Sequence, residues 1–303
     1  MTLPTVATIV VTYNSAHFIT NCLEGIRASS MPSQLVVVDN ASSDDTVGTV
    51  KEEAPDALVH ANSDNLGFAA ACNQGMDRAA DSAPDYYFFV NPDATVDRYC
   101  LKELVVALEA HPQAAVASPL ILESSSGVIW YAGARMDLES CDFGHRAWGD
   151  RDIGQFVATE ETGRPTGCAM LVRREAVDTV GPMDPSFFLY WEECEWMLRF
   201  RNAGFTALFV PSARAEHEVS STTGGVGSKY YEYYYLRNRL RFIHDTTRRS
   251  RGELVYSVGL ESMRRDVDTF RAWGWRAGVA TARAMVLAHW DFWRQNYGKS
   301  RWL

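Results

Sequence analysis

Short apolar runs alternate with helix-like segments along the first hundred residues of the chain. Residues 6–12, 35–38, 57–60 and 86–90 form runs of strand length, which predict buried strands. Between them, residues 18–26 and 68–80 have helical character, and residues 42–45 are typical of a helix start. This alternation predicts an α/β fold with a parallel, doubly wound sheet.

Polar side chains follow three of the predicted strands. The runs end in the tripeptides Thr12-Tyr13-Asn14, Asp39-Asn40-Ala41 and Asn91-Pro92-Asp93. In sheets of this class, ligands bind at the carboxyl ends of the strands. We therefore expect the three clusters to converge on one site.

The pattern weakens between residues 118 and 164, where we expect irregular strands and loops that cover a cleft. Beyond it, residues 166–173 and 206–210 predict strands, and residues 193–201 predict a helix. After Tyr230 the sequence is rich in arginine and aromatic residues and is helical in pattern to its end. We place a boundary near Gly227 and Ser228, which gives one domain over residues 1–228 and a helical extension over residues 229–303.

Three carboxylates lie within four positions in the aromatic stretch at residues 187–196. On a helix that begins there, Glu193 leads an apolar stripe with Trp196, Met197 and Phe200, and Glu192 falls on a more polar side. A carboxylate that faces the core costs free energy unless it is paired or used, so Glu193 is a candidate general base. The alternative is that Glu192 and Glu193 only cap the helix.

The turn after the first strand has neither the glycine pattern of dinucleotide-binding folds nor the glycines and lysine of a P-loop. The phosphates of a bound nucleotide then need another counter-charge, and Mg²⁺ or Mn²⁺ suits a diphosphate and oxygen ligands. Asp93 is the best candidate ligand, although a turn aspartate also satisfies backbone N–H groups. His217 joins it only if the chain returns to that site. The glycines at 224, 225 and 227 form either a mobile loop or a linker.

Seven short motifs occur along the chain, at residues 8–15, 36–43, 65–69, 91–94, 167–171 and 187–196 and at His217. Each is weak alone, but their order is specific. Together they resemble the inverting family-two glycosyltransferases, in particular the rhamnosyltransferase-like branch, over about residues 5–245. The resemblance implies a GT-A fold, in which a Rossmann-like, mostly parallel central sheet is flanked by helices.

The resemblance also implies a role for each matching residue. The nucleotide pocket would be lined by Thr12, Tyr13, Asn14, Asp39, Asn65, Asn91 and Asp93. Asp93 and His217 would bind the metal ion, Mg²⁺ or Mn²⁺. Glu193 would be the base that deprotonates the acceptor, with Glu192 as its possible substitute, and acceptor or sugar contacts would come from Trp191, Gly167 and Cys168.

Two residues depart from the family pattern. Asn91 stands where the family has the first aspartate of its metal motif, and Glu193 stands where aspartate is commoner. The implied activity is transfer from dTDP-rhamnose, another dTDP-deoxysugar or a UDP-hexose to an acceptor hydroxyl. The acceptor is left open among a glycan, a lipid-linked glycan and a small molecule. A non-catalytic protein that binds sugar nucleotides, or a scaffold, is the alternative.

The composition limits the classes of partner and the cellular location that we expect for this protein. The formal net charge of −9 excludes a general nucleic-acid binder. The six cysteines show no metal spacing and predict buried thiols of a reducing compartment. No apolar run is long enough to span a membrane and no signal sequence is recognisable, so we expect a cytoplasmic protein.

The C-terminal segment carries two sets of candidate contacts. Arg237, Arg239 and Arg241 either approach an anionic ligand or belong to a docking helix. Aromatic and basic residues of segment 273–294 either pack on the main domain or on a second subunit, as in a homodimer, or rest on the inner face of a membrane. They are Trp273, Trp275, Arg276, Arg283, Trp290, Phe292, Trp293 and Arg294. Both alternatives stay open at this point.

Overall fold

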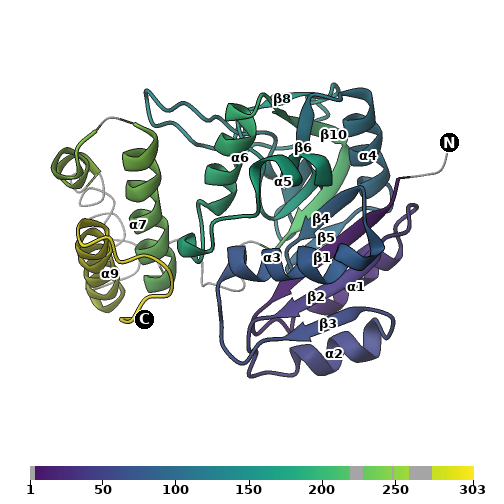
Figure 1. The fold of residues 1–303 in the computed structure, drawn as a ribbon, viewed down its shortest axis with the longest axis horizontal. Helices are drawn as coiled ribbons and strands as arrows, with labels where there is room; N and C mark the ends of the chain where they lie inside the picture. The colour runs from purple at the N-terminus through teal and green to yellow at the C-terminus, as the bar shows by residue number, and fades with distance from the viewer. Residues whose placement is uncertain (1–3, 219–227, 248, 259–274) are drawn as a thin grey trace.

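The computed structural model describes residues 4–218, 228–247, 249–258 and 275–303 (Figure 1). Its strands are β1 (Val6–Thr12), β2 (Gln34–Asp39), β3 (Leu58–Ala61), β4 (Tyr86–Val90), β5 (Ala94–Val96), β6 (Ala114–Glu123), β7 (Ile129–Tyr131), β8 (Glu160–Thr162), β9 (Ala169–Arg173) and β10 (Thr206–His217). Its helices are α1 (Ile19–Arg27), α2 (Thr46–Glu53), α3 (Phe68–Ala79), α4 (Cys100–Ala110), α5 (Arg174–Val180), α6 (Glu192–Asn202), α7 (Lys229–Thr246) and α9 (Trp275–Trp293), with short 3₁₀ turns at Ala80–Ser82 and Pro185–Phe187.

One mixed sheet joins these strands in the order β3-β2-β1-β4-β9-β6-β10-β5, with β7 beside β6 and β8 beside β10. The first four strands are mutually parallel, as the alternating pattern predicts. β9 is antiparallel to both β4 and β6, whereas β10 runs parallel to β6. The predicted α/β architecture is confirmed, and its second half mixes strand directions.

Helices cover both faces of the sheet because its central strands are apolar on both sides. In β1, Ile9 and Val11 belong to a core cluster shared with α3, while Val6 and Val10 belong to a second cluster shared with α1 and α4. α3 approaches β1 so closely that a Cβ on Gly75 would lie 2.4 Å from a methyl carbon of Ile9. The four predicted N-terminal strands and the helices predicted at residues 18–26 and 68–80 are confirmed within one residue at each end.

The region expected to be irregular contains a long strand. β6 begins at Ala114 and runs through Pro119, whose missing N–H argues against a central strand when only the sequence is read. The proline is accommodated because the pairing of β10 with β6 shifts register between Val210 and Arg214, next to the Val210–Pro119 pair. β7 and β8 are short, and the rest of residues 124–159 is loop with isolated bridges, as expected.

β10 extends to His217, whereas the sequence predicts a strand that stops at residue 210. After the register shift it resumes pairing with β6, and it pairs with β5 through His217 and Ala94. This continuation returns the chain to the turn that holds Asp93.

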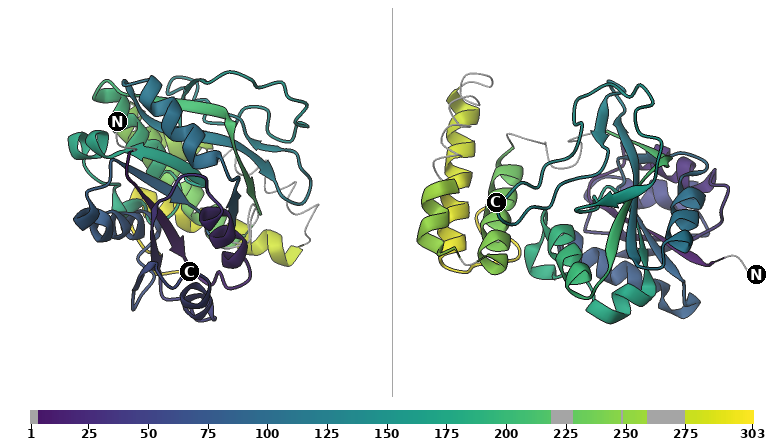
Figure 2. Two further views of the ribbon diagram at one scale, coloured as in Figure 1. Left: turned by 90° about the vertical axis from the view of Figure 1, so that its right-hand side faces the viewer. Right: turned by 90° about the horizontal axis from the view of Figure 1, so that it is seen from above.

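The helices after residue 228 confirm the predicted helical extension in its described part. α7 and α9 lie side by side at one end of the molecule, next to α6 (Figures 1 and 2). Gly227 and the neighbouring glycines at 224 and 225 lie outside the described residues, as does Trp273. The boundary between the two units therefore stays a prediction.

Candidate active site

The tips of β1 and β2 form one hydrogen-bonded network. Asp39, which is buried, accepts hydrogen bonds from Thr12 Oγ1 at 2.8 Å, from Ser42 N at 2.9 Å and from Ser42 Oγ at 2.5 Å. Asn14, whose φ is 50°, donates its backbone N–H to Ser42 Oγ and accepts from Ser43 N, both at 2.8 Å. Tyr13 stays exposed beside them. The structure therefore brings together Thr12, Asn14 and Asp39, as predicted from their positions at the strand ends.

Asn65 joins this region through the turn before α3. Its Oδ1 accepts from Gly67 N at 2.9 Å, and the Gly67 carbonyl accepts from Asn40 Nδ2 at 3.1 Å. Asn40 is buried at the end of β2, next to Asp39. The two asparagines thus connect the start of α3 to the tip of β2, a link that the sequence pattern does not reveal.

His217 and Asp93 form the second part of the site. His217 Nε2 lies 3.3 Å from Asp93 Oδ1, and both side chains are buried. The indole of Trp130 packs edge-on against the imidazole, with ring centroids 4.5 Å apart. Burial lowers the pKa of His217, but interactions with Cys168 and Asp93 outweigh burial and raise the pKa to about 10. The imidazole therefore carries a proton opposite the Asp93 carboxylate.

The same two side chains fit a divalent cation. Among the described residues, no group of three or more His, Cys, Asp and Glu side chains has a geometry that could hold a metal ion. However, His217 Nδ1 is buried, and no described residue forms a hydrogen bond with it. One carboxylate and one imidazole suit Mg²⁺ or Mn²⁺ when a diphosphate and water complete the coordination shell.

The start of α6 holds the two candidate bases in different surroundings. Glu193 lies 3.3 Å from Arg164 Nη1, and its side chain is 16% exposed. Glu192 is only 4% exposed, and within the described part of the chain its buried Oε2 has no hydrogen-bond partner. Burial, followed by the charge of Glu193, raises the pKa of Glu192 well above its ordinary value. Glu193 is thus half of an ion pair, whereas Glu192 holds its proton.

The predicted polar surroundings of Glu192 are therefore wrong. Helical spacing describes one isolated helix, but in the folded chain Cys72 of α3 lies near the side of α6 on which Glu192 is buried. Burial raises the pKa of Cys72 on α3, and Glu192 is the nearby acidic group that adds to this shift, so the two side chains are close. Tertiary packing rather than periodicity decides which carboxylate is inside.

A short segment links the two parts of the site. Arg164 pairs with Glu193, and Cys168, four residues later, interacts with His217. Four residues of extended chain span at most about 14 Å, so the carboxylate of α6 and the His217–Asp93 pair belong to one region. Arg164 was not among the predicted residues, because a lone arginine in an irregular segment has no distinguishing pattern.

The comparisons with known proteins bear on this geometry. The Glycosyl transferase family 2 model matches residues 7–181, more than half of the chain and all of the strand tips described above. The chain belongs to glycosyl transferase family 2.

Among proteins of known activity, the N-acetylglucosaminyl-diphospho-decaprenol L-rhamnosyltransferase of two Mycobacterium tuberculosis strains is similar to the chain. The identity is 27% over 247 residues, which cover 73% of this chain and 78% of the mycobacterial protein. The predicted resemblance to the rhamnosyltransferase-like branch is confirmed, and the chain is a glycosyltransferase. This finding favours an enzyme over a non-catalytic binding protein.

Solved structures show the same fold. The mannosyltransferase PcManGT from Pyrobaculum calidifontis, in complex with GDP-Man and Mn²⁺, is similar with a TM-score of 0.60 at 17% identity, over 95% of this chain and 88% of that one. GalNAc-T7 with UDP, GalNAc and Mn²⁺ also gives a TM-score of 0.60 at 17% identity, over 78% of this chain and 47% of that one. The predicted GT-A fold is confirmed.

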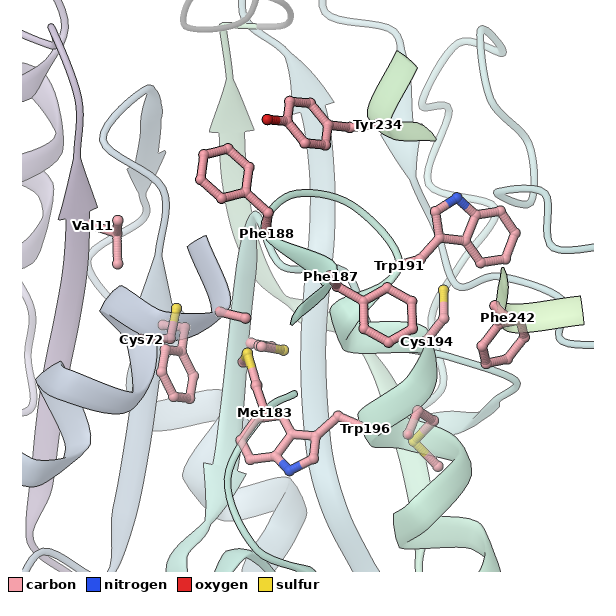
Figure 3. Close-up of a cluster of buried hydrophobic side chains, with 14 of the residues drawn as sticks. Val11, Cys72, Met183, Phe187, Phe188, Trp191, Cys194, Trp196, Tyr234 and Phe242 are labelled. Carbon is pink, nitrogen blue, oxygen red and sulfur yellow. The ribbon is translucent and has the colours of Figure 1, made fainter. Parts of the chain in front are cut away.

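In this family 2 enzyme, the residues expected to contact sugar or acceptor lie directly before α6 and directly before β9. Trp191 immediately precedes α6 and is buried, with its ring against Phe143, Tyr235 and Phe242 (Figure 3). Its indole Nε1 is buried, and it has no hydrogen-bond partner among the residues that the structure describes. Gly167 faces the ring of Phe68. Cys168 is buried, and its carbonyl accepts from the backbone N–H of Asn91 at 2.8 Å.

Two arginines of α7 belong to a docking helix. Arg241 bonds to Ser186 Oγ and Asp184 Oδ2, each at 2.7 Å. Arg237 is buried and donates to the Phe187 carbonyl at 3.2 Å. Both guanidinium groups therefore bind the segment before α6. Of the two alternatives left open by the sequence, an anionic ligand or a docking helix, the structure supports the docking helix for these two arginines.

All six cysteines are free thiols, and five of them are buried. This agrees with their predicted structural role. Among the described residues, no helix is both long and apolar enough to cross a membrane.

We predict that Glu192→Gln stabilises the protein increasingly as the pH rises. The folded-state pKa of Glu192 exceeds its ordinary value of 4.5, so its contribution to stability is fully present below pH 4.5 and is lost as the pH rises through the folded-state pKa. Glutamine does not ionise, so the gain in unfolding free energy grows by about 1.4 kcal/mol per pH unit between the two pKa values. Urea denaturation at a series of pH values measures it.

Glu195→Gln is the matched control on the same helical turn. Glu195 is partly exposed and accepts from Arg199 Nε at 2.8 Å, so its loss brings no gain in stability. If the unfolding free energies of Glu192→Gln and the unmodified protein differ by the same amount at every pH, the result contradicts a buried, protonated Glu192.

Proposed function

We propose that this glycosyltransferase moves a sugar from a nucleotide-sugar donor to an acceptor hydroxyl by direct displacement, with inversion at the anomeric carbon. The observation that carries the proposal is the Glu193–Arg164 ion pair, one short segment away from the His217–Asp93 pair. Donor candidates are dTDP-rhamnose, another dTDP-deoxysugar and a UDP-hexose. The name of the mycobacterial relative supports a rhamnosyl donor and a lipid-linked acceptor.

The donor nucleotide would occupy the tips of β1 and β2. Thr12, Tyr13, Asn14 and Asp39 would contact the nucleoside, with Asn65 closing the pocket from the α3 side. The exposed ring of Tyr13 offers a stacking surface for the base, and the Asp39 network fixes the loop around it. Asn91 and Asp93 would approach the diphosphate.

Glu193 would act as the base. A base must accept a proton, and Glu193 faces the Arg164 guanidinium at 3.3 Å, whereas burial raises the pKa of Glu192 well above its ordinary value. The proton of the acceptor hydroxyl moves to Glu193 as the acceptor oxygen bonds to the anomeric carbon. The bond from that carbon to the diphosphate oxygen breaks at the same time, and its electrons leave with the diphosphate. Glu192 remains the substitute if the ion pair reorganises.

Asp93 and His217 would hold a divalent cation, Mg²⁺ or Mn²⁺, with His217 losing its proton on binding. When bound, the cation supplies charge stabilisation to the leaving diphosphate. Asn91 contributes an amide in place of a carboxylate, so the protein places one negative charge fewer around the diphosphate. The two structural neighbours described above hold Mn²⁺ with nucleotide or nucleotide sugar.

Glu193→Gln tests the base assignment. Glutamine keeps the shape of the side chain but does not accept the proton, so turnover should fall about 10²- to 10⁴-fold. Release of nucleoside diphosphate is measured with a panel of dTDP-sugars and UDP-sugars, and donor affinity by calorimetry. Donor affinity should stay within a few-fold of the unmodified enzyme. Unchanged turnover in this variant, with Glu195→Gln as the control, refutes the assignment.

Metal removal tests the roles of Asp93 and His217. EDTA should abolish the release of nucleoside diphosphate, and excess Mg²⁺ or Mn²⁺ should restore it, because the diphosphate then regains its counter-charge. Asp93→Asn should raise the metal concentration needed for half-maximal activity. Full activity in chelator would mean that these two side chains serve another purpose.

The outer side of α9 is a candidate contact surface, which we call the α9 face. It consists of Val279, Arg283, Val286, Trp290 and Trp293, all exposed and spaced by three or four residues. Asp291, the sole carboxylate in the α9 sequence, is buried on the opposite side. Phe292 was expected on this surface but is also buried, and the side chains of Trp275 and Arg276 lie outside the described residues.

We propose that the α9 face rests on an anionic membrane surface, where tryptophan and arginine are favoured. The protein should float with phosphatidylglycerol vesicles but not with phosphatidylcholine vesicles, and salt should weaken the binding. Replacing Trp290 and Trp293 by alanine should abolish flotation, whereas Trp148→Ala, at an exposed tryptophan far from α9 in the sequence, should not. The competing outcome is a homodimer through α9. In that case the molecular mass in solution would double as the protein concentration rises, and the double variant would remain a monomer. This result would overturn the membrane proposal.

A further inference from the structure

The segment that leads into α6 has an unfavourable backbone. Phe188, Tyr190 and Trp191 have φ values of 66°, 66° and 76°. Side chains other than glycine rarely adopt positive φ, and this conformation costs free energy. Contacts from elsewhere must therefore hold residues 187–191, which we call the α6 entry loop, in this shape.

Asn238 on α7 supplies these contacts. Its Nδ2 donates to the carbonyl oxygens of Phe187, Leu189 and Tyr190 at 2.6, 2.8 and 3.0 Å. The side chain has no exposed surface, so water does not replace these bonds. Two amide hydrogens serve three carbonyls, which gather the entry loop around one nitrogen atom.

Arg237 fixes the direction of this amide. Its Nε donates to Asn238 Oδ1 at 3.0 Å, which leaves the amide nitrogen turned toward the entry loop. Its Nη1 donates to the Gly298 carbonyl at 2.8 Å, so the C-terminal tail supports the same guanidinium group. The orientation of Asn238 is therefore set from the side away from the active site.

The entry loop connects the two halves of the candidate site. The Phe188 carbonyl accepts from Phe68 N, at the start of α3, at 2.6 Å. Gly67 lies so close that a Cβ there would be 2.5 Å from the same oxygen. At its other end the loop runs directly into Glu192 and Glu193. A shift of the loop would move the first turn of α6 relative to the donor pocket.

We propose that Asn238 is a positioning residue for sugar transfer. By fixing the entry loop, it sets the direction in which the Glu193 carboxylate meets the acceptor hydroxyl. This inference rests on the proposed role of Glu193 as the base. Asn14 and Asp39 are held by their own hydrogen bonds, so loss of the Asn238 contacts affects the transfer step far more than donor binding.

Asn238→Asp removes the donor hydrogens at nearly constant volume. We expect kcat to fall about 100-fold, because small displacements of a reacting group cost that much. The dissociation constants of dTDP and UDP should change less than threefold, and the KM for the donor should follow them. The assay uses the full chain and the donor that the unmodified enzyme turns over in the panel described above. Asn238→Ser, which keeps one donor hydrogen, should give an intermediate kcat.

Tyr234→Phe is the matched control. It removes a buried hydroxyl of α7 that accepts from Ser300 N at 2.9 Å, and it keeps the ring that stacks on Phe188. Its kcat should stay near that of the unmodified enzyme even where its melting temperature falls as much as that of the Asn238 variants. If Asn238→Asp does not fold, Asn238→Ser is compared with Tyr234→Phe instead.

Three results overturn the proposal: an unchanged kcat in Asn238→Asp, an equal loss of kcat in Tyr234→Phe at equal stability, and a loss of dTDP and UDP binding that accounts for the whole effect. The outcome is separable from that of the base assignment. If Glu193→Gln keeps its turnover, the base is wrong. If Glu193→Gln loses turnover and Asn238→Asp keeps it, only the positioning role fails.

Discussion

Two carboxylates at consecutive positions need a counter-charge if either is to stay ionised away from bulk water, and Arg164 supplies it. The Arg164 and Glu193 side chains are 12% and 16% exposed, so their attraction is weakly screened. Arg164 is itself anchored by the Phe143 carbonyl, which its Nε and Nη2 reach at 3.2 and 3.0 Å. Burial, followed by the charge on Glu193, raises the pKa of Glu192. One turn of helix therefore holds two glutamates in different electrostatic surroundings.

The second constraint is the path of β10. A strand that ended at Pro211 would leave His217 in a loop, since proline cannot donate to the sheet. The register shift between Val210 and Arg214 absorbs the proline, and the strand then continues beside β5 and β6. The ion pair of Arg214 with Asp152 fixes the strand just after the shift. β5 follows the Asp93 turn directly. The continued strand therefore places the His217 imidazole next to the Asp93 carboxylate, 124 positions earlier in the chain.

Those parts of the structure that depend on local pattern were predictable from the sequence. The apolar run of β1, the polar tripeptides at the strand tips and the helical extension all follow from residue types and spacing. The burial of Glu192 was not predictable, because it depends on residues distant in the sequence, such as Cys72 of α3, that approach Glu192 only in the folded chain. Neither was the partner of Glu193, since nothing near Arg164 in the sequence marks it. The strand β6 was missed for a different reason. Proline cannot donate a backbone hydrogen bond and is therefore unexpected in a central strand, but Pro119 lies next to a register shift that accommodates it.

Helix α7 shows why a helical extension in this fold belongs with the active site rather than beside it. Asparagine is a poor choice for the interior of an 18-residue helix, because its amide competes with the backbone for hydrogen bonds. At position 238 that amide instead donates to carbonyls of the entry loop, whose backbone is unfavourable. Glutamine would place the amide nitrogen one carbon farther from the helix. Aspartate would place a carboxylate oxygen, which cannot donate, against the carbonyl oxygens of the loop. The geometry of the entry loop therefore demands this side chain at this position, and the local cost to α7 is offset by order at the start of α6.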